Sequence, residues 1–513
     1  MAALPDAVER LKRRLTTITD LRNAAQLLRW DQEVLMPPEG ASARAGTLAT
    51  LSGLAHDLFI DAETGRLLEA AEREAKDLDP DSDEAALVRM TRRDYDRLTR
   101  LPTAFVAERA RQASLSVQVW REARRRDDFP AFRPSLQTMV EYARRTADYL
   151  GFTDHPYDAL LDLYEPDMTA REVETIFSRV RAVTVPFVRA IVSRPAVDDS
   201  FLRADYPEDG QRAFGLMVAE AFGYDLRRGR LDISPHPFAT AFSVNDVRIT
   251  TRYQRRYLPS ALFGIFHETG HALYEQGIAP SLDRTPLARG ASLGLHESQS
   301  RMWENLVGRS RPFWRHYFPQ LQRQFPEPLR DVDAEAFYRA VNRVQPSLIR
   351  VEADELTYNL HIMLRFELER QLLEGSLRVE ALPGAWAERM EAYLGQIPPR
   401  DADGVLQDIH WAQGSLGYFP TYSLGNIISV QLYEAARAAH PSLEEEIGQG
   451  RFGNLLGWLR EHLHRHGRKY LPRELLRRAT GSELTVEPYL NYLRRKFGEL
   501  YGISAGASAA AGD

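Results

Sequence analysis

Five consecutive residues in the middle of the chain have the types and spacing of a metal chelate with its own base. His267 and His271 lie four positions apart in an apolar run, residues 257–278, that predicts one helix. Residues four apart on a helix differ by only about 40° around the axis, so both imidazoles can reach one tetrahedral zinc ion. Glu268 lies beside them and is placed to act as a general base on a water. The pentapeptide therefore predicts hydrolytic chemistry at a divalent metal.

A catalytic zinc usually has three protein ligands, and the best candidate for the third is Glu297. It lies in a second predicted helix, residues 295–305, after a connection rich in Gly and Pro that can reverse the chain so that the two helices pack side by side. The rival ligands are Glu304, Glu275 and Asp283. Glu275, one turn after His271, is better placed to orient an imidazole from behind, and Asp283 falls in the flexible connection.

The surroundings of the pentapeptide support a buried site. Its flanks are nearly all apolar, which places the helix in a core, where adjacent polar side chains are costly unless they bind something. Gly270 costs a helix about 1 kcal/mol relative to Ala, which predicts that another backbone or a ligand approaches closely at that point.

Most of the chain is predicted to be helical. A helix-packing seam begins it, formed by Leu4, Val8, Leu11, Leu15 and Ile18. Further helical patterns cover roughly residues 39–58, 81–99, 103–126, 131–150, 169–194, 210–223, 333–343, 354–375, 380–397, 423–440 and 485–501. Without a linker or a composition shift, we expect residues 1–503 to form a single mainly α, two-lobed domain with a deep active-site cleft, followed by a disordered tail at 504–513.

One segment, residues 238–251, alternates between apolar and polar residues as a half-buried strand does, which predicts a small sheet near the zinc helix. In it Asp246, Arg248 and Thr250 share one face and could line a cleft. An exposed edge here could pair with an extended peptide, whose main chain would then be bound without regard to its side chains. The alternative is a short structural hairpin with a solvated polar face.

Composition narrows the class of protein. The 513 residues, 44% hydrophobic and 27% charged, are typical of a globular protein with ample core. The formal net charge of −6 argues against a protein that binds nucleic acid by neutralising phosphates. The absence of Cys excludes disulfides and thiolate ligands. The charged N-terminal segment predicts no signal peptide, and the apolar stretches are too short to span a membrane, so a cytoplasmic location is expected.

Six motifs together resemble those of a known family. They are HPF at 236–238, DVRIT at 246–250, HETGH at 267–271, HESQSR at 296–301, IRVEAD at 349–354 and GVLQDIHW at 404–411. In this order the motifs resemble zinc metallocarboxypeptidases of the carboxypeptidase Taq family, relatives of thimet oligopeptidase and angiotensin-converting enzyme. The resemblance implies release of single C-terminal residues from peptides with a free C-terminus and broad specificity, one Zn²⁺ per chain that Co²⁺ can replace, and a homodimer.

Further site residues follow from the chemistry and from the resemblance. The oxyanion formed during hydrolysis needs donors, for which the candidates are Tyr422 first, then Tyr418, His410 and His236. Tyr418 also counts as a substrate-binding residue, with Asp246 and Arg248 on the predicted strand. A C-terminal carboxylate is best held by a bidentate arginine, and the family pattern selects Arg350, with Arg248 and Arg301 as runners-up. Asp354 and Asp408 either orient such groups or serve as acids at helix N-termini.

Two other patterns have simpler explanations. His462, His464 and His466 resemble a chelate, but residues two apart on a helix point about 200° apart. The basic stretch 460–478 lacks the interleaved aromatics of an RNA-binding surface. Two alternatives to a carboxypeptidase remain. One is a zinc oligopeptidase that cleaves internal bonds, and the other is a non-catalytic helical binding protein, which would have no need of Glu268.

Overall fold

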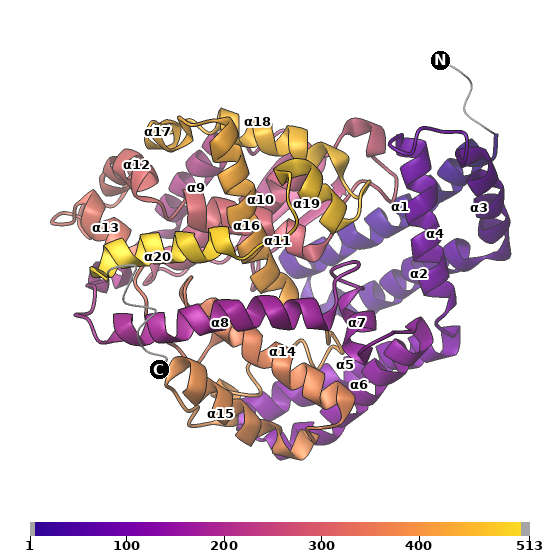
Figure 1. Cartoon of the computed structure of the whole chain (residues 1–513), viewed down its shortest axis with the longest axis horizontal. Coiled ribbons are helices and arrows are strands. Elements are labelled where there is room, and N and C mark those ends of the chain that lie inside the picture. The colour runs from indigo at the N-terminus through magenta and orange to yellow at the C-terminus, as the bar shows by residue number, and fades with distance from the viewer. Residues whose placement is uncertain (1–5, 504–513) are drawn as a thin grey trace. The chain divides into compact units, whose positions relative to one another are not determined.

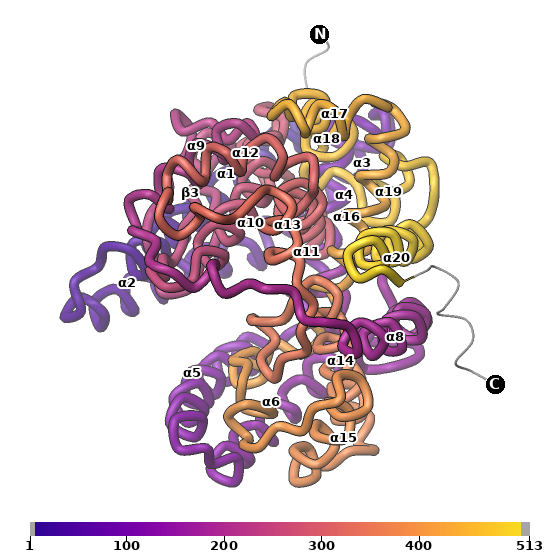
Figure 2. The backbone as a smooth tube through the Cα atoms, turned by 90° about the vertical axis from the view of Figure 1, so that its left-hand side faces the viewer, coloured from indigo at the N-terminus to yellow at the C-terminus, as the bar shows by residue number. Residues whose placement is uncertain are grey.

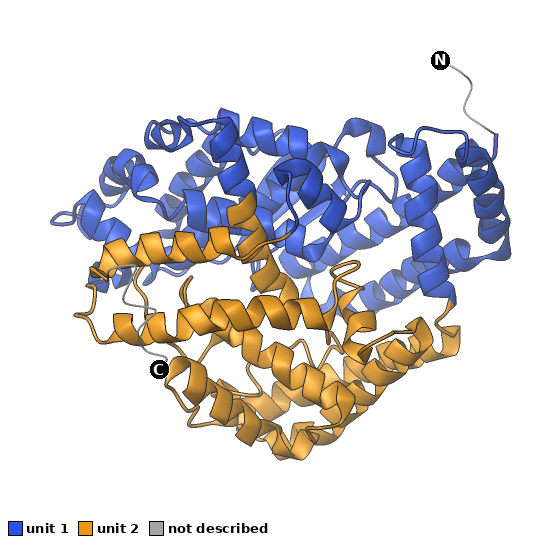
Figure 3. Ribbon diagram, in the orientation of Figure 1, with its two compact units in different colours: residues 1–99, 198–341, 432–483 blue, residues 100–197, 342–431, 484–513 orange. Residues whose placement is uncertain are grey.

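The computed structural model describes residues 6–503, which fall into two compact units (Figure 3). Unit 1 contains residues 1–99, 198–341 and 432–483, and unit 2 contains residues 100–197, 342–431 and 484–513. Both units are therefore built from three separate chain segments. The expected disordered tail at 504–513 and Leu4 of the first helix seam lie outside the described residues.

Unit 1 is mostly helical (Figure 1). Its helices are α1 (Asp6–Val34), α2 (Ala41–Ile60), α3 (Ala62–Ala75), α4 (Asp83–Thr99), α9 (Glu208–Phe222), α10 (Leu258–Gly277), α11 (Leu293–Arg301), α12 (Arg311–Gln324), α13 (Ala334–Val341), α17 (Leu443–Gly448), α18 (Gly453–His462) and α19 (Pro472–Thr480). The apolar seam of α1 is buried at Val8, Leu11, Leu15 and Ile18, as its spacing of three and four predicts.

The strands described in unit 1 form one small sheet, β1 (Gly229–Ile233), β2 (Ala239–Ser243) and β3 (Asp246–Thr251), in the order β1-β3-β2. β3 pairs in parallel with β1 and in antiparallel with β2. Val247 and Ile249 of β3 are fully buried, and β3 packs against α10, beside which Figure 2 draws it. The sheet thus lies directly on the helix that carries the pentapeptide.

The prediction for residues 238–251 was wrong in part. The segment is a hairpin of two strands, as in the alternative, rather than one strand. β3 is the central strand and offers no free edge, whereas β2 is an edge strand of the sheet. Thr250 does not line a cleft with Asp246 and Arg248, because its side chain is fully buried. Its hydroxyl accepts a hydrogen bond from the Phe238 amide at 2.9 Å and contacts the Ser234 hydroxyl at 2.7 Å.

Unit 2 is built from helices that pack in neighbouring pairs. They are α5 (Thr103–Arg126), α6 (Phe129–Leu150), α7 (Pro156–Leu161), α8 (Ala170–Val192), α14 (Tyr358–Glu374), α15 (Leu382–Leu394) and α20 (Glu487–Tyr501). α5 packs against α6 and α14 against α15, and Figure 2 shows each pair side by side. A further helix, α16 (Pro420–Ala439), belongs to unit 2 through Gln431 and to unit 1 from Leu432.

The expectation of a mainly α fold with a small sheet near the helix of the pentapeptide is confirmed. Within the described residues, no helix combines the length and the apolar character that a membrane crossing requires. That residues 1–503 form a single two-lobed domain around a cleft stays a prediction.

Candidate metal centre

Three of the predicted residues converge in unit 1. His267 and His271 lie on α10, and Glu297 lies on α11. The Glu297 Oε2 atom is 3.6 Å from Nε2 of His267 and 3.4 Å from Nε2 of His271. Ligands bonded to tetrahedral zinc at about 2.0–2.1 Å are themselves about 3.3 Å apart. In the part of the chain that the structure describes, these three residues form the one cluster of His, Asp and Glu side chains suited to hold a metal.

The close packing of α10 on α11 depends on Gly270. A Cβ atom at this position would lie 2.5 Å from the carbonyl oxygen of Gln299 and 2.6 Å from Cα of Ser300. Both of those residues follow Glu297 closely on α11, so the missing side chain lets the carboxylate reach the two histidines. The close backbone approach predicted for Gly270 is therefore confirmed.

The helix that carries Glu297 has defined ends. Ser292 caps its N-terminus, since the Ser292 hydroxyl accepts a hydrogen bond from the Leu295 amide at 3.0 Å. At its C-terminus α11 continues into a π-helix, η4 (Met302–Val307), which carries Glu304. Single turns of π-helix occur preferentially at functional sites.

Glu304 supports a metal ligand and is not placed as one itself. Its Oε2 atom lies 2.9 Å from Nδ1 of His267, the ring nitrogen that does not face Glu297. Arg301 and Arg309 also donate to the Glu304 carboxylate, at 3.3 and 3.2 Å. A carboxylate behind a metal-binding histidine fixes its tautomer and ring orientation. The arrangement leaves Nε2 of His267 available for the metal.

His271 is supported through a second histidine. Nδ1 of His296 lies 2.6 Å from Nδ1 of His271, and Nε2 of His296 lies 2.8 Å from Oε1 of Glu275. Glu275 therefore acts from behind, as predicted, but through His296 rather than directly. Sequence reasoning gave His296 no role of its own, although its position next to Glu297 on one predicted helix was a signal for it.

The electrostatics of the centre follow from burial and close charges. Burial raises the pKa of Glu297, but Arg301 and the two histidines outweigh it and hold this pKa below its usual range. Burial, aided by the charge of His296, lowers the pKa of His271 to about 3. Burial also raises the pKa of Glu268 to about 7. The third ligand is thus anionic and His271 is neutral, which are the forms that bind a metal.

The other candidates in unit 1 have structural partners. Asp283 is not a ligand, because its carboxylate accepts hydrogen bonds from the Ser243 hydroxyl and the Val244 amide at the β2–β3 turn. Arg301 donates to Glu297 Oε1 at 2.8 Å, so it supports the third ligand. His462, His464 and His466 form no metal cluster within the described residues, and His464 is buried with Nε2 2.8 Å from the Gln299 side-chain oxygen.

Asp246 and Arg248 pair with one another on β3. Arg248 donates to the two Asp246 oxygens at 2.8 and 2.9 Å, and its guanidinium lies 4.3 Å from the centre of the Trp30 ring. His236 is exposed in the segment between β1 and β2, and its backbone carbonyl accepts a hydrogen bond from Ser234. The structure brings none of these three into the metal-binding trio.

The remaining predicted residues gather in unit 2 around Asp408. Arg350 is 6% exposed and donates to the Asp408 carboxylate through Nε and Nη2, at 3.1 and 2.7 Å, and to the Tyr358 hydroxyl at 2.8 Å. Arg365, fully buried, donates to the same carboxylate at 2.8 Å. Burial opposes ionisation of Asp408, but the two arginines hold its pKa below the usual range. The Asp408 carboxylate thus forms ion pairs with two buried arginines.

His410, Tyr418 and Tyr422 form an aromatic group beside Arg350. Nε2 of His410 lies 3.2 Å from the Tyr422 hydroxyl, and the ring of Tyr418 is centred 5.3 Å from each of the other two. The Arg350 guanidinium lies 5.1 Å from the centre of the Tyr422 ring. Burial, with the nearby arginines, lowers the pKa of His410 to about 4.

Asp354 and Asp408, left open between two roles by the sequence, are separated by the structure. Asp354 accepts hydrogen bonds from the amides of Leu356 and Thr357, just before α14 begins at Tyr358, so it is a helix N-terminal acid. Asp408 orients Arg350.

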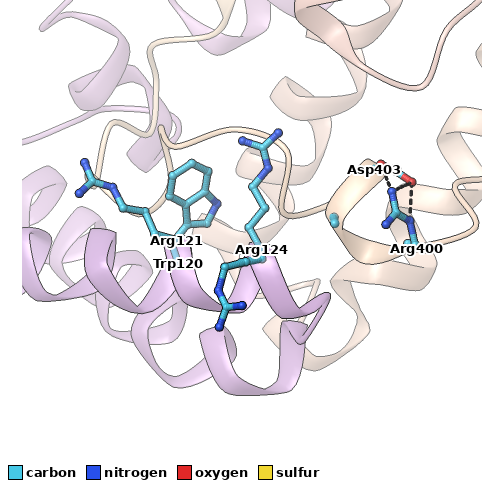
Figure 4. A pocket seen from close by; sticks show the side chains of 7 residues that line it. Trp120, Arg121, Arg124, Arg400 and Asp403 are labelled. Carbon is cyan, nitrogen blue, oxygen red and sulfur yellow. Dashed lines mark hydrogen bonds and ion pairs between the residues drawn. The ribbon is translucent and has the colours of Figure 1, made fainter. Parts of the chain in front are cut away.

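Unit 2 also has an open surface hollow of about 440 Å³ between the end of α5 and η7 (Asp401–Asp403), shown in Figure 4. Its walls include Trp120, Arg121, Arg124 and Arg400, the last of which pairs with Asp403 at 2.9 Å. It contains none of the predicted site residues.

Comparison with known proteins agrees with the motifs and the metal-binding trio. The family model for carboxypeptidase Taq (M32) metallopeptidase matches residues 10–497. Thermostable carboxypeptidase 1 of Thermus thermophilus is 44% identical over 492 residues, which cover 94% of this chain and 96% of that protein. Carboxypeptidase 1 of Bacillus subtilis is 37% identical over 488 residues, 95% and 97% of the two chains.

A solved structure is equally similar. The crystal structure of an M32 carboxypeptidase from Deinococcus radiodurans matches with a TM-score of 0.94 and 44% identity, covering 97% of this chain and 100% of that one. The chain therefore belongs to the carboxypeptidase Taq (M32) metallopeptidase family, as its six motifs predicted, and is a metallocarboxypeptidase.

Proposed function

We propose that the metal is zinc, one ion per chain, and that the enzyme releases single C-terminal residues from peptides with little preference for their side chains. The observation that carries the proposal is the convergence of Nε2 of His267, Nε2 of His271 and Oε2 of Glu297. Two histidines and one glutamate are a ligand set of catalytic zinc, which keeps a further position for water or substrate. Cobalt, which accepts similar ligands, should replace zinc.

Zinc bound there would acidify a water and polarise the scissile carbonyl. Glu268 takes the proton of the attacking water and passes it to the leaving amine. Glu268 follows His267 directly in the sequence. It is only 6% exposed, so bulk water has little access to its carboxylate. Glu304 and His296 keep both imidazoles turned so that their Nε2 atoms face Glu297.

Tyr422, His410 and His236 are the hydrogen-bond donors that we assign to the oxyanion of the tetrahedral intermediate. Tyr422 is the first choice, because its hydroxyl is within 3.2 Å of His410, which can fix its orientation. With a lowered pKa, His410 is neutral near pH 7 and keeps one N–H to donate. His236 is a weaker candidate than Tyr422 because it is exposed and has no such aromatic partner in the described residues.

We assign the free C-terminal carboxylate of the substrate to Arg350. Asp408 carries one negative charge and is shared by Arg350 and Arg365, so the group keeps one positive charge in excess. An arginine held by a carboxylate behind it presents its remaining N–H groups in a fixed direction, which suits a bidentate partner. Asp246, Arg248 and Tyr418 are assigned to the rest of the bound peptide.

The experiment is a product ladder from two matched peptides, one with a free C-terminus and one amidated. The wild-type enzyme should shorten the free peptide residue by residue and cleave the amidated one at least about a hundred-fold more slowly, since a charged pair is lost. Arg350→Ala should remove most of this difference, whereas Arg400→Ala, an exposed arginine of the same unit, should keep it. Equal cleavage of both peptides by the wild type would instead indicate an endopeptidase.

A further inference from the structure

Outside the metal centre, unit 1 contains a second group of charges, in which several arginines surround one carboxylate. This Asp94 cluster consists of Asp94 on α4, Arg22 on α1, Arg289 in the α10–α11 connection, and Arg468 after the short helix η8 (His464–His466). Arg468 donates to both Asp94 oxygens, at 2.5 and 2.7 Å, and both residues are buried. Nη2 of Arg289 lies 3.4 Å from Asp94 Oδ2.

The cluster has more positive charge than its one acid can neutralise. Asp94 supplies one negative charge, while Arg22, Arg289 and Arg468 supply three positive charges. Within the described residues, no carboxylate other than Asp94 forms an ion pair with any of these three arginines. Arg97 also lies 3.5 Å from Asp94 Oδ1, so a further arginine shares the negative charge of the same carboxylate.

The geometry of hydrogen bonding leads to the same result. A carboxylate has about four acceptor positions, and the fork of Arg468 takes two of them. Arg289 and Arg22 are left with donors that Asp94 cannot fully satisfy. Burial lowers the pKa of Arg22, the charge of Asp94 opposes this shift, and the charge of Arg468 adds to it.

The part of the cluster that lacks acceptors is open to solvent. The side chain of Arg289 is 52% exposed, whereas those of Asp94 and Arg468 are 9% and 5% exposed. We propose that the Asp94 cluster is a binding site for a small oxyanion, a carboxylate or a phosphate group. The ligand is held by Arg289, and the buried Arg468–Asp94 pair fixes the base of the site.

The α10–α11 connection that carries Arg289 also reaches the metal centre. Arg289 precedes Gly290, where a Cβ atom would lie 2.8 Å from Cδ2 of His296. His296 in turn contacts the ligand His271. The oxyanion is either a free anion or, resting on the proposed function, an acidic side chain of the peptide substrate.

Calorimetric titration of inorganic phosphate into the metal-loaded enzyme at constant ionic strength tests the site. The wild type should bind phosphate saturably, and Arg289→Ala should weaken binding about ten-fold or more through loss of a charge-assisted donor. Arg22→Ala should weaken binding in the same direction. Arg284→Ala is the matched control, because Arg284 lies in the same connection but is already paired with Asp20 at 3.0 and 2.5 Å.

Two results would overturn the proposal. One is phosphate binding by Arg289→Ala that equals the wild type, and the other is binding that survives in this variant but vanishes when the metal is removed, which would locate the anion on the metal. The source of the oxyanion is tested with peptides that differ only by Glu or Gln at one position. A preference for Glu in KM that Arg289→Ala abolishes supports a substrate side chain, and phosphate binding without such a preference supports a free anion.

Discussion

The two metal-binding histidines are held by partners of different charge. His267 has the Glu304 carboxylate at its Nδ1 atom, and His271 has the imidazole of His296. A carboxylate raises the basicity of the imidazole in front of it, so Glu304 contributes to metal affinity as well as to orientation.

Removing the charge of Glu304 should therefore weaken the metal site. In Glu304→Gln the side chain keeps its shape and one acceptor, so we expect metal binding to weaken by about ten-fold, the lower end for such partners. Competition with a chelator of known affinity measures the change. Glu220→Gln, an exposed glutamate on α9, is the control, and equal affinities in the two variants would contradict the role of Glu304.

Glu268 should matter for turnover and not for metal binding. Glu268→Gln removes the general base while it leaves His267, His271 and Glu297 in place, so kcat should fall by about 10²- to 10⁴-fold. Metal analysis of the same preparation should still find about one zinc per chain. Retained activity, or loss of the metal, would show that Glu268 has another role.

The three candidate ligands could be predicted from sequence, but their supports only in part, since Glu275 was expected behind an imidazole and His296 was not. His267, His271 and Glu297 stand out because the spacing of the first two is local to one helix and the third follows one reversal of the chain. The contact between His296 and His271 depends on how α10 and α11 are rotated against each other. Glu304 was expected only as a rival to Glu297 for the third ligand, and the structure instead places it on the π-helix behind His267.

At the scale of elements, the spacing between α10 and α11 sets the geometry of the site. Gly270→Ala would place a methyl group 2.5 Å from the Gln299 carbonyl oxygen, so the helices must separate. We expect this variant to lose about 1–3 kcal/mol of stability and to bind zinc more weakly, because Glu297 moves with α11.

Gly264 on the same helix provides the matched control. A methyl group there would meet its neighbours at ordinary distances, 3.6 Å from Thr251 Oγ1 and 3.9 Å from Pro237 Cγ. Gly264→Ala should therefore be neutral or stabilising by up to about 1 kcal/mol, since Ala favours a helix. Thermal unfolding and zinc affinity of both variants check this. Similar behaviour of the two would contradict the close approach at Gly270.

In unit 2, a buried carboxylate holds the turn that leads to Tyr418. Glu369 on α14 accepts hydrogen bonds from Trp411 Nε1, the Gly417 amide and the Tyr157 hydroxyl, at 2.8, 3.1 and 2.8 Å. Burial raises the pKa of Glu369 from 4.5 to about 7. Between these two values the folded chain binds more protons than the unfolded chain, so the free energy of unfolding falls as the pH rises through this window.

Glu369→Gln should lack this loss of stability. Placing an amide among three donors lowers the free energy of unfolding of the variant by the same amount at every pH. The difference in Tm, variant minus wild type, should therefore rise by roughly 1–3 °C between pH 5 and pH 8. Melting curves across this range measure it. Parallel curves for the two proteins would mean that Glu369 does not titrate there.

Long amphipathic helices were predictable and short or paired elements were not. The helix predicted at residues 103–126 has the same bounds as α5. An apolar stripe within one helix can be recognised from local sequence alone, without knowledge of the element it packs against. α12 was missed because Pro312 and Pro319 interrupt its pattern. β1 was missed because its five residues alternate too briefly, and its pairing with β3 is a long-range contact.

At the scale of the whole molecule, the family resemblance implies a homodimer. Light scattering on the purified protein should then give a mass of twice the 58.4 kDa of the chain, independent of concentration over the assay range. A mass of 58.4 kDa at all concentrations would contradict the dimer and would leave the metal centre unaffected, since its three ligands come from one chain.

The central claim is that one metal ion is shared by His267, His271 and Glu297. The most direct test is anomalous diffraction at the zinc edge from crystals of the zinc-loaded enzyme. The account predicts one strong peak per chain, about 2.0–2.2 Å from Nε2 of both histidines and from a carboxylate oxygen of Glu297. A peak bound by other residues, or one that leaves Glu297 out of contact, would contradict it.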